Sequence, residues 1–100
     1  MEVFLSDLAE YKLKKLAEFL LEEWSYKVKM EFLEKLTNKI NQIADQPESC
    51  PKSMELGGIY KCVVTKQTTF YYRIHHTFNE IEIITLFDTR KDPNSLKKDM

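Results

Sequence analysis

The sequence predicts an α+β fold, in which a short N-terminal strand and an antiparallel two-helix hairpin precede a small antiparallel sheet (β-α-α-β-β-β). Apolar residues recur at helical spacing in the first half of the chain, and β-branched or alternating runs fill the second half. The connections between the later strands are short, which requires antiparallel neighbours. We expect one domain over residues 1–100, with the hairpin at about 7–46, the sheet at about 58–88 and a mobile tail at about 94–100.

The first predicted elements are a strand at Val3-Phe4-Leu5 and a helix over about residues 7–23. Ser6 is placed to cap this helix, and Asp7 adds negative charge at the positive end of its dipole. Residues spaced three and four apart form a single apolar stripe along it: Leu13, Leu16, Ala17, Leu20, Leu21 and Trp24.

Ser25 is placed to cap a second helix, which Pro47 ends. Its stripe also follows steps of four and three: Val28, Phe32, Leu36, Ile40 and Ile43. Almost nothing separates the two helices, so they are predicted to form a tight antiparallel hairpin whose stripes pack as mutual core.

A linker rich in proline and short polar residues, at 46–57, leads into three predicted strands at residues 59–66, 68–75 and 81–87. The last strand is β-branched and is followed by Asp88-Thr89-Arg90. A buried strand that ends at an arginine directs a permanently charged, five-donor guanidinium outward. The alternative is that Arg90 pairs with Asp88 or Asp92 in a solvated turn.

Composition excludes several classes of protein. No apolar stretch has the length of a membrane span, and the N-terminus lacks the pattern of a signal peptide, so a cytoplasmic protein without membrane contact is expected. Cys50 and Cys62 are expected to be free thiols. They could bind zinc with His75 and His76, but no C-x-x-C spacing supports a metal site, and no cofactor is expected.

Charge is distributed unevenly along the chain. Residues 1–49 hold seven lysines and ten acidic residues, whereas residues 50–100 hold eight basic and six acidic residues. The second half is therefore the better candidate for an anionic partner. Its small excess does not predict strong autonomous DNA binding, which needs a dense basic patch.

In this order the elements resemble the RelE/ParE family of bacterial toxins, the toxin halves of type II toxin–antitoxin systems, and the ParE-like side in particular. The resemblance covers nearly the whole chain. It is carried by Val3-Phe4-Leu5-Ser6, Glu23-Trp24-Ser25, Pro51-Lys52, Gly58-Ile59-Tyr60-Lys61, Phe70-Tyr71-Tyr72-Arg73-Ile74 and Leu86-Phe87-Asp88-Thr89-Arg90-Lys91-Asp92-Pro93.

The resemblance implies one of two activities. RelE-like members are metal-independent endoribonucleases that cut mRNA on the ribosome, using cations on the sheet and often a tyrosine near the C-terminus. If this chain were RelE-like, its candidate cations would be Lys61, Lys66, Arg73 and Arg90. Thr69 stands roughly where the mid-sheet arginine is expected, and Leu96 roughly where the tyrosine is expected. A histidine could replace the missing acid–base group. The position of His75 and His76 at a strand end favours an exposed or capping role instead.

ParE-like members inhibit DNA gyrase by binding, which requires a surface and no catalytic set. The resemblance implies that the helical turn and the C-terminal region contact the target, here through Trp24, Tyr26, Arg90 and Lys91. For Trp24 and Tyr26, packing within the hairpin turn is the alternative role. A third hypothesis is a non-toxic relative that binds an antitoxin or has a regulatory role.

A cognate antitoxin is expected to neutralise either kind of toxin. Alternation along a strand places Tyr71 on the opposite face from Phe70 and Tyr72, so one face of the sheet cannot take all three inward. Phe70, Tyr71 and Arg73 are therefore the candidate antitoxin-binding residues.

Overall fold

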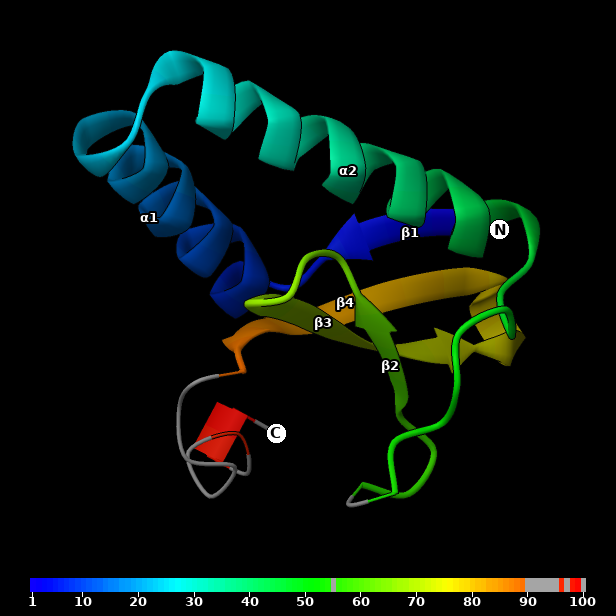
Figure 1. The fold of residues 1–100 in the computed structure, drawn as a ribbon. Helices are drawn as coiled ribbons and strands as arrows, with labels where there is room; N and C mark the ends of the chain where they lie inside the picture. The colour runs from blue at the N-terminus through cyan, green and yellow to red at the C-terminus, as the bar shows by residue number, and fades with distance from the viewer. Residues whose placement is uncertain (55, 90–95, 97, 100) are drawn as a thin grey trace.

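The computed structural model of the chain describes residues 1–54, 56–89, 96, 98 and 99. Its elements follow the predicted order. They are β1 (Glu2–Leu5), α1 (Asp7–Glu23), α2 (Tyr26–Asp45), β2 (Tyr60–Val63), β3 (Thr68–His75), a 3-10 turn (His76–Phe78) and β4 (Glu80–Asp88). Figure 1 shows α2 crossing above the sheet and α1 descending from the helical turn towards the end of β4.

The four strands form one sheet in the order β1-β4-β3-β2. β2, β3 and β4 pair in antiparallel fashion, as predicted. β1 pairs with β4 in parallel, with Val3 opposite Ile81, so the sheet is mixed rather than wholly antiparallel. Parallel neighbours need a long connection between them. Here the two helices, β2 and β3 all lie between β1 and β4 in the chain.

Both predicted helix caps are present. The Ser6 hydroxyl accepts a hydrogen bond from the Ala9 amide at 3.0 Å and donates one to the Ile84 carbonyl at 2.6 Å. It therefore caps α1 and ties the start of this helix to β4. The Ser25 hydroxyl caps α2 by accepting from the Val28 amide at 3.1 Å. Each cap of this kind stabilises a helix by about 1 kcal/mol.

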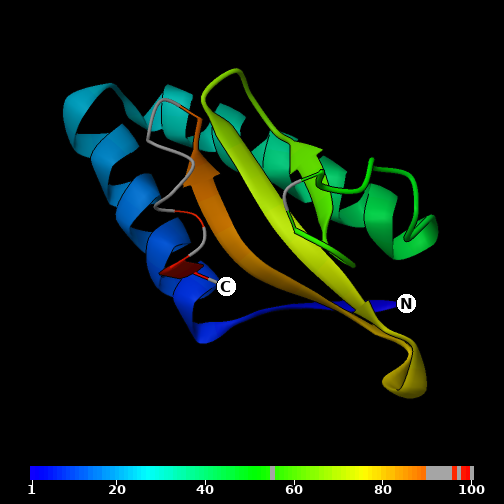
Figure 2. The same ribbon diagram turned by 90° about the horizontal axis from the view of Figure 1, so that it is seen from below.

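Both helices pack on the same face of the sheet, and in Figure 2 α2 lies behind the strands while α1 lies to their left. The core between the two layers contains one side of each inner strand, including Phe70, Tyr72, Ile81 and Ile83. Phe32, Leu36 and Ile43 of α2 pack onto it.

The opposite face of the sheet has a smaller core of its own: Ile59, Tyr71, Ile84, Phe87 and Leu96, with Leu56 at its edge. A β-bulge interrupts the regular pairing of β3 with β4. Tyr72 pairs with Ile83 and Tyr71 with Thr85, so Ile84 is the extra residue.

The predicted mobile tail lies partly outside the described residues. Of those described, Leu96 is buried in the smaller core, and Asp99 accepts hydrogen bonds from Lys12 and Thr85. At these two positions an apolar contact and an ion pair join the segment to β4 and α1.

Within the described ranges, no helix is both long enough and apolar enough to cross a membrane.

Candidate partner-binding groove

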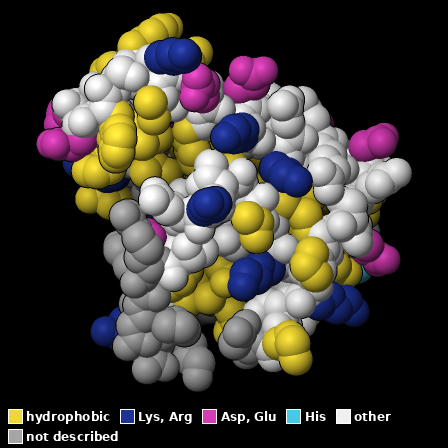
Figure 3. Space-filling view, viewed as in Figure 1, with side chains coloured by type: hydrophobic (Ala, Val, Ile, Leu, Met, Phe, Trp, Pro, Cys, Tyr) yellow, Lys and Arg dark blue, Asp and Glu magenta, His cyan; other side chains and the backbone are white. Residues whose placement is uncertain are grey.

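A long groove of about 970 Å³ lies between the two helices, the turn joining β2 to β3, and the end of β4. Its walls come from α1 (Tyr11, Lys12, Lys15, Leu16, Phe19, Leu20), the helical turn (Trp24), α2 (Val28, Glu31, Phe32, Lys35), the strand turn (Thr65, Lys66, Gln67, Thr68) and β4 (Leu86, Phe87, Asp88). Figure 3 shows hydrophobic side chains gathered in the space between the helices, with Lys and Arg side chains beside them.

The groove exists because the helices reach beyond the sheet. Near their turn, the apolar stripes of both helices have no strand beneath them, as the diverging helices in Figure 1 show. Phe19 and Trp24 therefore remain exposed along the groove, and Tyr11, nearer the start of α1, is exposed there as well. Clustered exposed aromatic side chains of this kind mark surfaces that a protein partner covers.

Trp24 and Tyr26 are both largely exposed at the helical turn, at 68% and 65%. The sequence allows two roles for them, packing within the turn or contact with a partner. Such exposure leaves little packing of either side chain within the turn. Of these two residues, Trp24 lines the groove and Tyr26 does not.

Basic side chains outnumber acidic ones around the groove. Lys12, Lys15, Lys35 and Lys66 line it, against Glu31 and Asp88. Lys12 pairs with Asp99, and Lys15 lies 3.9 Å from Glu18 and over the ring of Tyr11. An apolar floor with a basic rim suits an amphipathic segment whose polar face is acidic.

The antitoxin-binding residues predicted from the sequence do not lie on an open surface. Phe70 and Tyr72 face the helices and Tyr71 faces the other way, so the predicted division between faces is correct. The error lies in what covers Tyr71: the chain covers it itself, with Ile59, Leu96 and neighbouring residues. Phe70 and Tyr71 are buried, and of the three candidates only Arg73 is partly exposed.

Arg73 and His75 share one carboxylate on the outer face of the sheet. His75 Nε2 lies 2.9 Å from Glu82 Oε1, and Arg73 Nε lies 3.5 Å from the same oxygen, without a well-formed hydrogen bond. The ring of Phe4 stacks on His75 at 6.3 Å. These contacts give His75 a structural partner on β4, which differs from the exposed or capping role expected for it.

Among the described residues, the candidate cations of an endoribonuclease do not converge. Lys61 and Arg73 project from the outer face, where the register makes them diagonal neighbours. Lys66 lies in the strand turn and lines the groove on the helical side. Arg90, like the target-binding candidate Lys91, lies outside the described residues.

Thr69 and Leu96 occupy the positions at which a RelE-like toxin is expected to have an arginine and a tyrosine, and both side chains are buried. Thr69 is fully buried, and its hydroxyl has no hydrogen-bond partner among the described residues. Leu96 is buried in the smaller core. Neither side chain can carry charge or donate a proton to a substrate.

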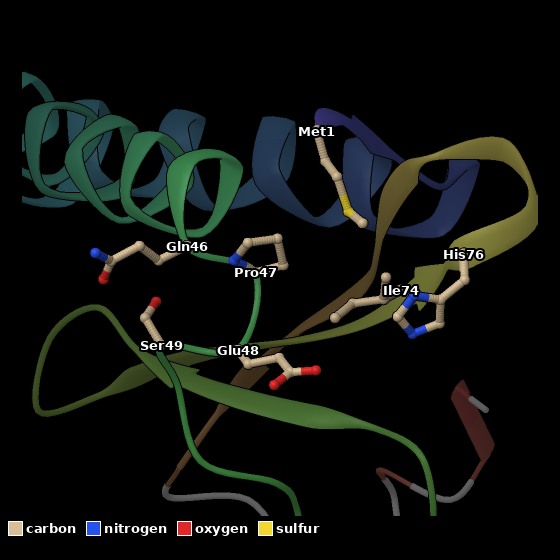
Figure 4. A pocket seen from close by; sticks show the side chains of 7 residues that line it. All are labelled: Met1, Gln46, Pro47, Glu48, Ser49, Ile74 and His76. Atoms are coloured by element: carbon tan, nitrogen blue, oxygen red, sulfur yellow. The ribbon is translucent and has the colours of Figure 1, made fainter.

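A second, shallower depression of about 420 Å³ is lined by Met1, Gln46, Pro47, Glu48, Ser49, Ile74 and His76. Figure 4 shows its polar side chains pointing in different directions rather than at one point. It therefore lacks the convergent groups of an active site. Among the described residues, no three His, Cys, Asp or Glu side chains gather as a metal site would require.

Of the groove residues, the sequence predicts a site role for Trp24 and Lys66, whereas it assigns Leu16, Leu20, Val28 and Phe32 to the core. The available signal was the number of apolar residues on α1: Phe19 and Leu21 extend the stripe beyond the width that one sheet can cover.

The arrangement of a helical hairpin on a mixed four-stranded sheet is that of RelE/ParE-like toxins. It is similar to the chromosomal ParDE toxin–antitoxin system of P. aeruginosa, with a TM-score of 0.70 and 12% identity over 88% of this chain and 95% of that one. It is also similar to the YoeB/ParE toxin of Agrobacterium tumefaciens (TM-score 0.64, 16% identity, 88% and 98% covered) and to the isolated E. coli RelE toxin (0.64, 12%, 99% and 98%). At these identities the likeness shows the fold alone.

The sequence itself places the chain more narrowly. Residues 3–93 match the family model described as the ParE toxin of the type II toxin–antitoxin system, parDE. The chain therefore belongs to the ParE toxin family, and membership implies a cognate antitoxin as its partner. No relative among curated proteins matches it.

Proposed function

We propose that this toxin inhibits DNA gyrase by binding it, and that its antitoxin neutralises it by seating an amphipathic segment in the groove. The observation that carries the choice of target is the burial of Thr69 and Leu96. Cleavage of RNA needs a neutralised phosphate and a proton for the leaving oxygen. Two positions that would supply these groups hold buried side chains without charge.

The separation of the three candidate cations in the described part of the chain supports the same choice. Lys61 and Arg73 are on the outer face, whereas Lys66 is on the helical side. Arg73 is also engaged by Glu82. Inhibition by binding needs none of these groups to meet at one phosphate.

The target-binding surface proposed here combines Trp24 and Tyr26 at the helical turn with Arg90 and Lys91 of the C-terminal region. The exposure of the two aromatic residues is the structural support for this surface. Aromatic and arginine side chains supply most of the binding energy in protein interfaces.

The antitoxin segment is proposed to be amphipathic and acidic. The groove combines exposed aromatic side chains with four lysines and two acidic residues. A segment that folds as it binds there buries apolar surface and gives a negative heat-capacity change. Calorimetry with the product of the neighbouring small reading frame tests this, and an absence of binding contradicts it.

Two assays with the purified toxin test the target. In a gyrase supercoiling assay we expect inhibition that the antitoxin reverses. In a translating extract we expect no cleavage of mRNA by primer extension. Cuts in the ribosomal A site that disappear with Lys61→Ala or Lys66→Ala would establish the endoribonuclease instead. A protein inactive in both assays that still binds the antitoxin would be the non-toxic relative.

A further inference from the structure

Two buried cysteines meet where the linker crosses the edge of the sheet. Cys50 in the linker is 7% exposed and Cys62 on β2 is 1% exposed, and both belong to the main core. Both are reduced in the structure. Neither takes part in the proposed binding of gyrase or antitoxin.

The backbone sets the linker beside β2 as a short additional strand. Lys52 and Tyr60 form an antiparallel bridge. The Lys61 amide donates to the Pro51 carbonyl at 2.9 Å, one residue along from that bridge. In this register Lys52 lies opposite Tyr60 and Pro51 lies opposite Lys61.

One further step in this register places Cys50 opposite Cys62. The hydrogen bond lies at the 51/61 position, so the next pair is of the non-hydrogen-bonded kind, in which opposite Cα atoms are about 4.5 Å apart. Disulfides form across Cα separations of about 4.4–6.8 Å. The backbone thus needs no large movement for the two sulfurs to bond.

The two thiols also interact electrostatically. Burial raises the pKa of the Cys62 thiol to about 12, and a hydrogen bond and charge interaction with Cys50 contribute to the shift. Burial and Cys50 also raise the pKa of the Tyr72 hydroxyl. This hydroxyl donates to the Pro47 carbonyl at 2.7 Å, which anchors the linker on the other side of Cys50.

We propose that Cys50 and Cys62 are a reversible disulfide site that locks the linker onto β2, with a small-molecule disulfide such as oxidised glutathione as the oxidant. The Cys50 thiolate attacks one sulfur of glutathione disulfide and releases one glutathione thiolate. The Cys62 sulfur, on losing its proton, attacks the Cys50 sulfur and releases the second. Two protein thiols are oxidised, one disulfide is reduced to two thiols, and the two protons pass to the glutathione thiolates.

The order of attack follows from the structure. Cys50 is the more exposed cysteine and lies in a linker, which can open locally while β2 and β3 stay paired. Cys62 is held within β2, between the linker and β3, and stays protonated at neutral pH. Cys50 is therefore the attacking cysteine and Cys62 the resolving one.

The test uses the purified, reduced full-length chain in buffers with increasing ratios of oxidised to reduced glutathione. We expect loss of both alkylatable thiols, a monomer by non-reducing electrophoresis, and a cross-linked peptide joining Cys50 to Cys62. Closing a loop of this length is expected to raise the melting temperature by about 10–20 °C, reversibly on reduction.

Two single variants serve as matched controls. Cys62→Ser should accumulate a glutathione adduct on Cys50, and Cys50→Ser should remain unmodified over the same time. Neither should show the rise in melting temperature. The proposal is overturned if the native wild-type protein forms only adducts or intermolecular dimers, or if the cross-link appears only after denaturation.

Discussion

Replacing Trp24 by alanine tests the groove as the antitoxin site. Trp24 lines the groove and is 68% exposed. A tryptophan side chain buries about 150–250 Å² when it is fully covered, so a partner seated there would cover roughly 100–170 Å² of it. At about 25 cal/mol per Å², this area contributes roughly 2.5–4 kcal/mol to binding.

Trp24→Ala is therefore expected to weaken antitoxin binding by about 60-fold or more. Folding should change little, because the side chain is largely in water before the partner binds. Surface substitutions of this kind alter stability by about 0.5 kcal/mol, a shift of only a few degrees in melting temperature. Titration calorimetry measures the affinity and differential scanning calorimetry measures the stability.

Tyr26→Ala is the matched control. Tyr26 is an aromatic residue of nearly equal exposure, two positions away, but it does not line the groove. Its loss should change antitoxin affinity less than about threefold, because it lies outside the covered surface. Unchanged affinity in Trp24→Ala, or equal losses in the two variants, would refute the groove as the antitoxin site.

Three further predictions follow from single residues. Arg90→Ala should weaken gyrase inhibition more than tenfold, because a charge-assisted contact contributes about 1.5–3 kcal/mol to binding. Arg90→Lys should restore only part of the inhibition, since lysine keeps the charge but not the bidentate geometry. Full inhibition by the alanine variant would remove Arg90 from the binding surface. Tyr72→Phe should lower the stability to urea by about 1–3 kcal/mol, because the Pro47 carbonyl loses its donor, and an unchanged midpoint would contradict this. The free energy of unfolding should also fall as pH rises from about 9 towards 12, because the unfolded chain releases the Cys62 proton while the folded chain retains it. The melting temperature of Cys62→Ser should decline less steeply over this range. Parallel declines in the two proteins would refute the raised pKa of Cys62.

Local signals account for the elements that the sequence predicted correctly. Ser6 and Ser25 can cap helices in any context, because each hydroxyl binds an amide three residues ahead. The antiparallel strands β2, β3 and β4 are joined by short connections that leave no other pairing. The opposite facing of Phe70 and Tyr71 follows from the geometry of a single strand. Each of these features depends on residues within a few positions of one another.

Features made by residues distant in sequence were decided by the tertiary structure. The parallel pairing of β1 with β4 joins the two ends of the chain, and local periodicity carries no information on it. Trp24 lies on the same apolar stripe as Leu13 but is exposed, because the helix extends past the sheet there. Tyr71 is correctly placed on the outer face, yet Leu96 covers it from 25 positions away.

The groove and the cysteine pair have the same origin. Sequence determines that α1 and α2 are amphipathic and that Cys50 and Cys62 lie in a linker and a strand. The angle between the helices and the register of the linker on β2 depend on how the layers pack. The helix angle and the linker register are those that bury the shared core, and this burial involves contacts between segments that only folding brings together.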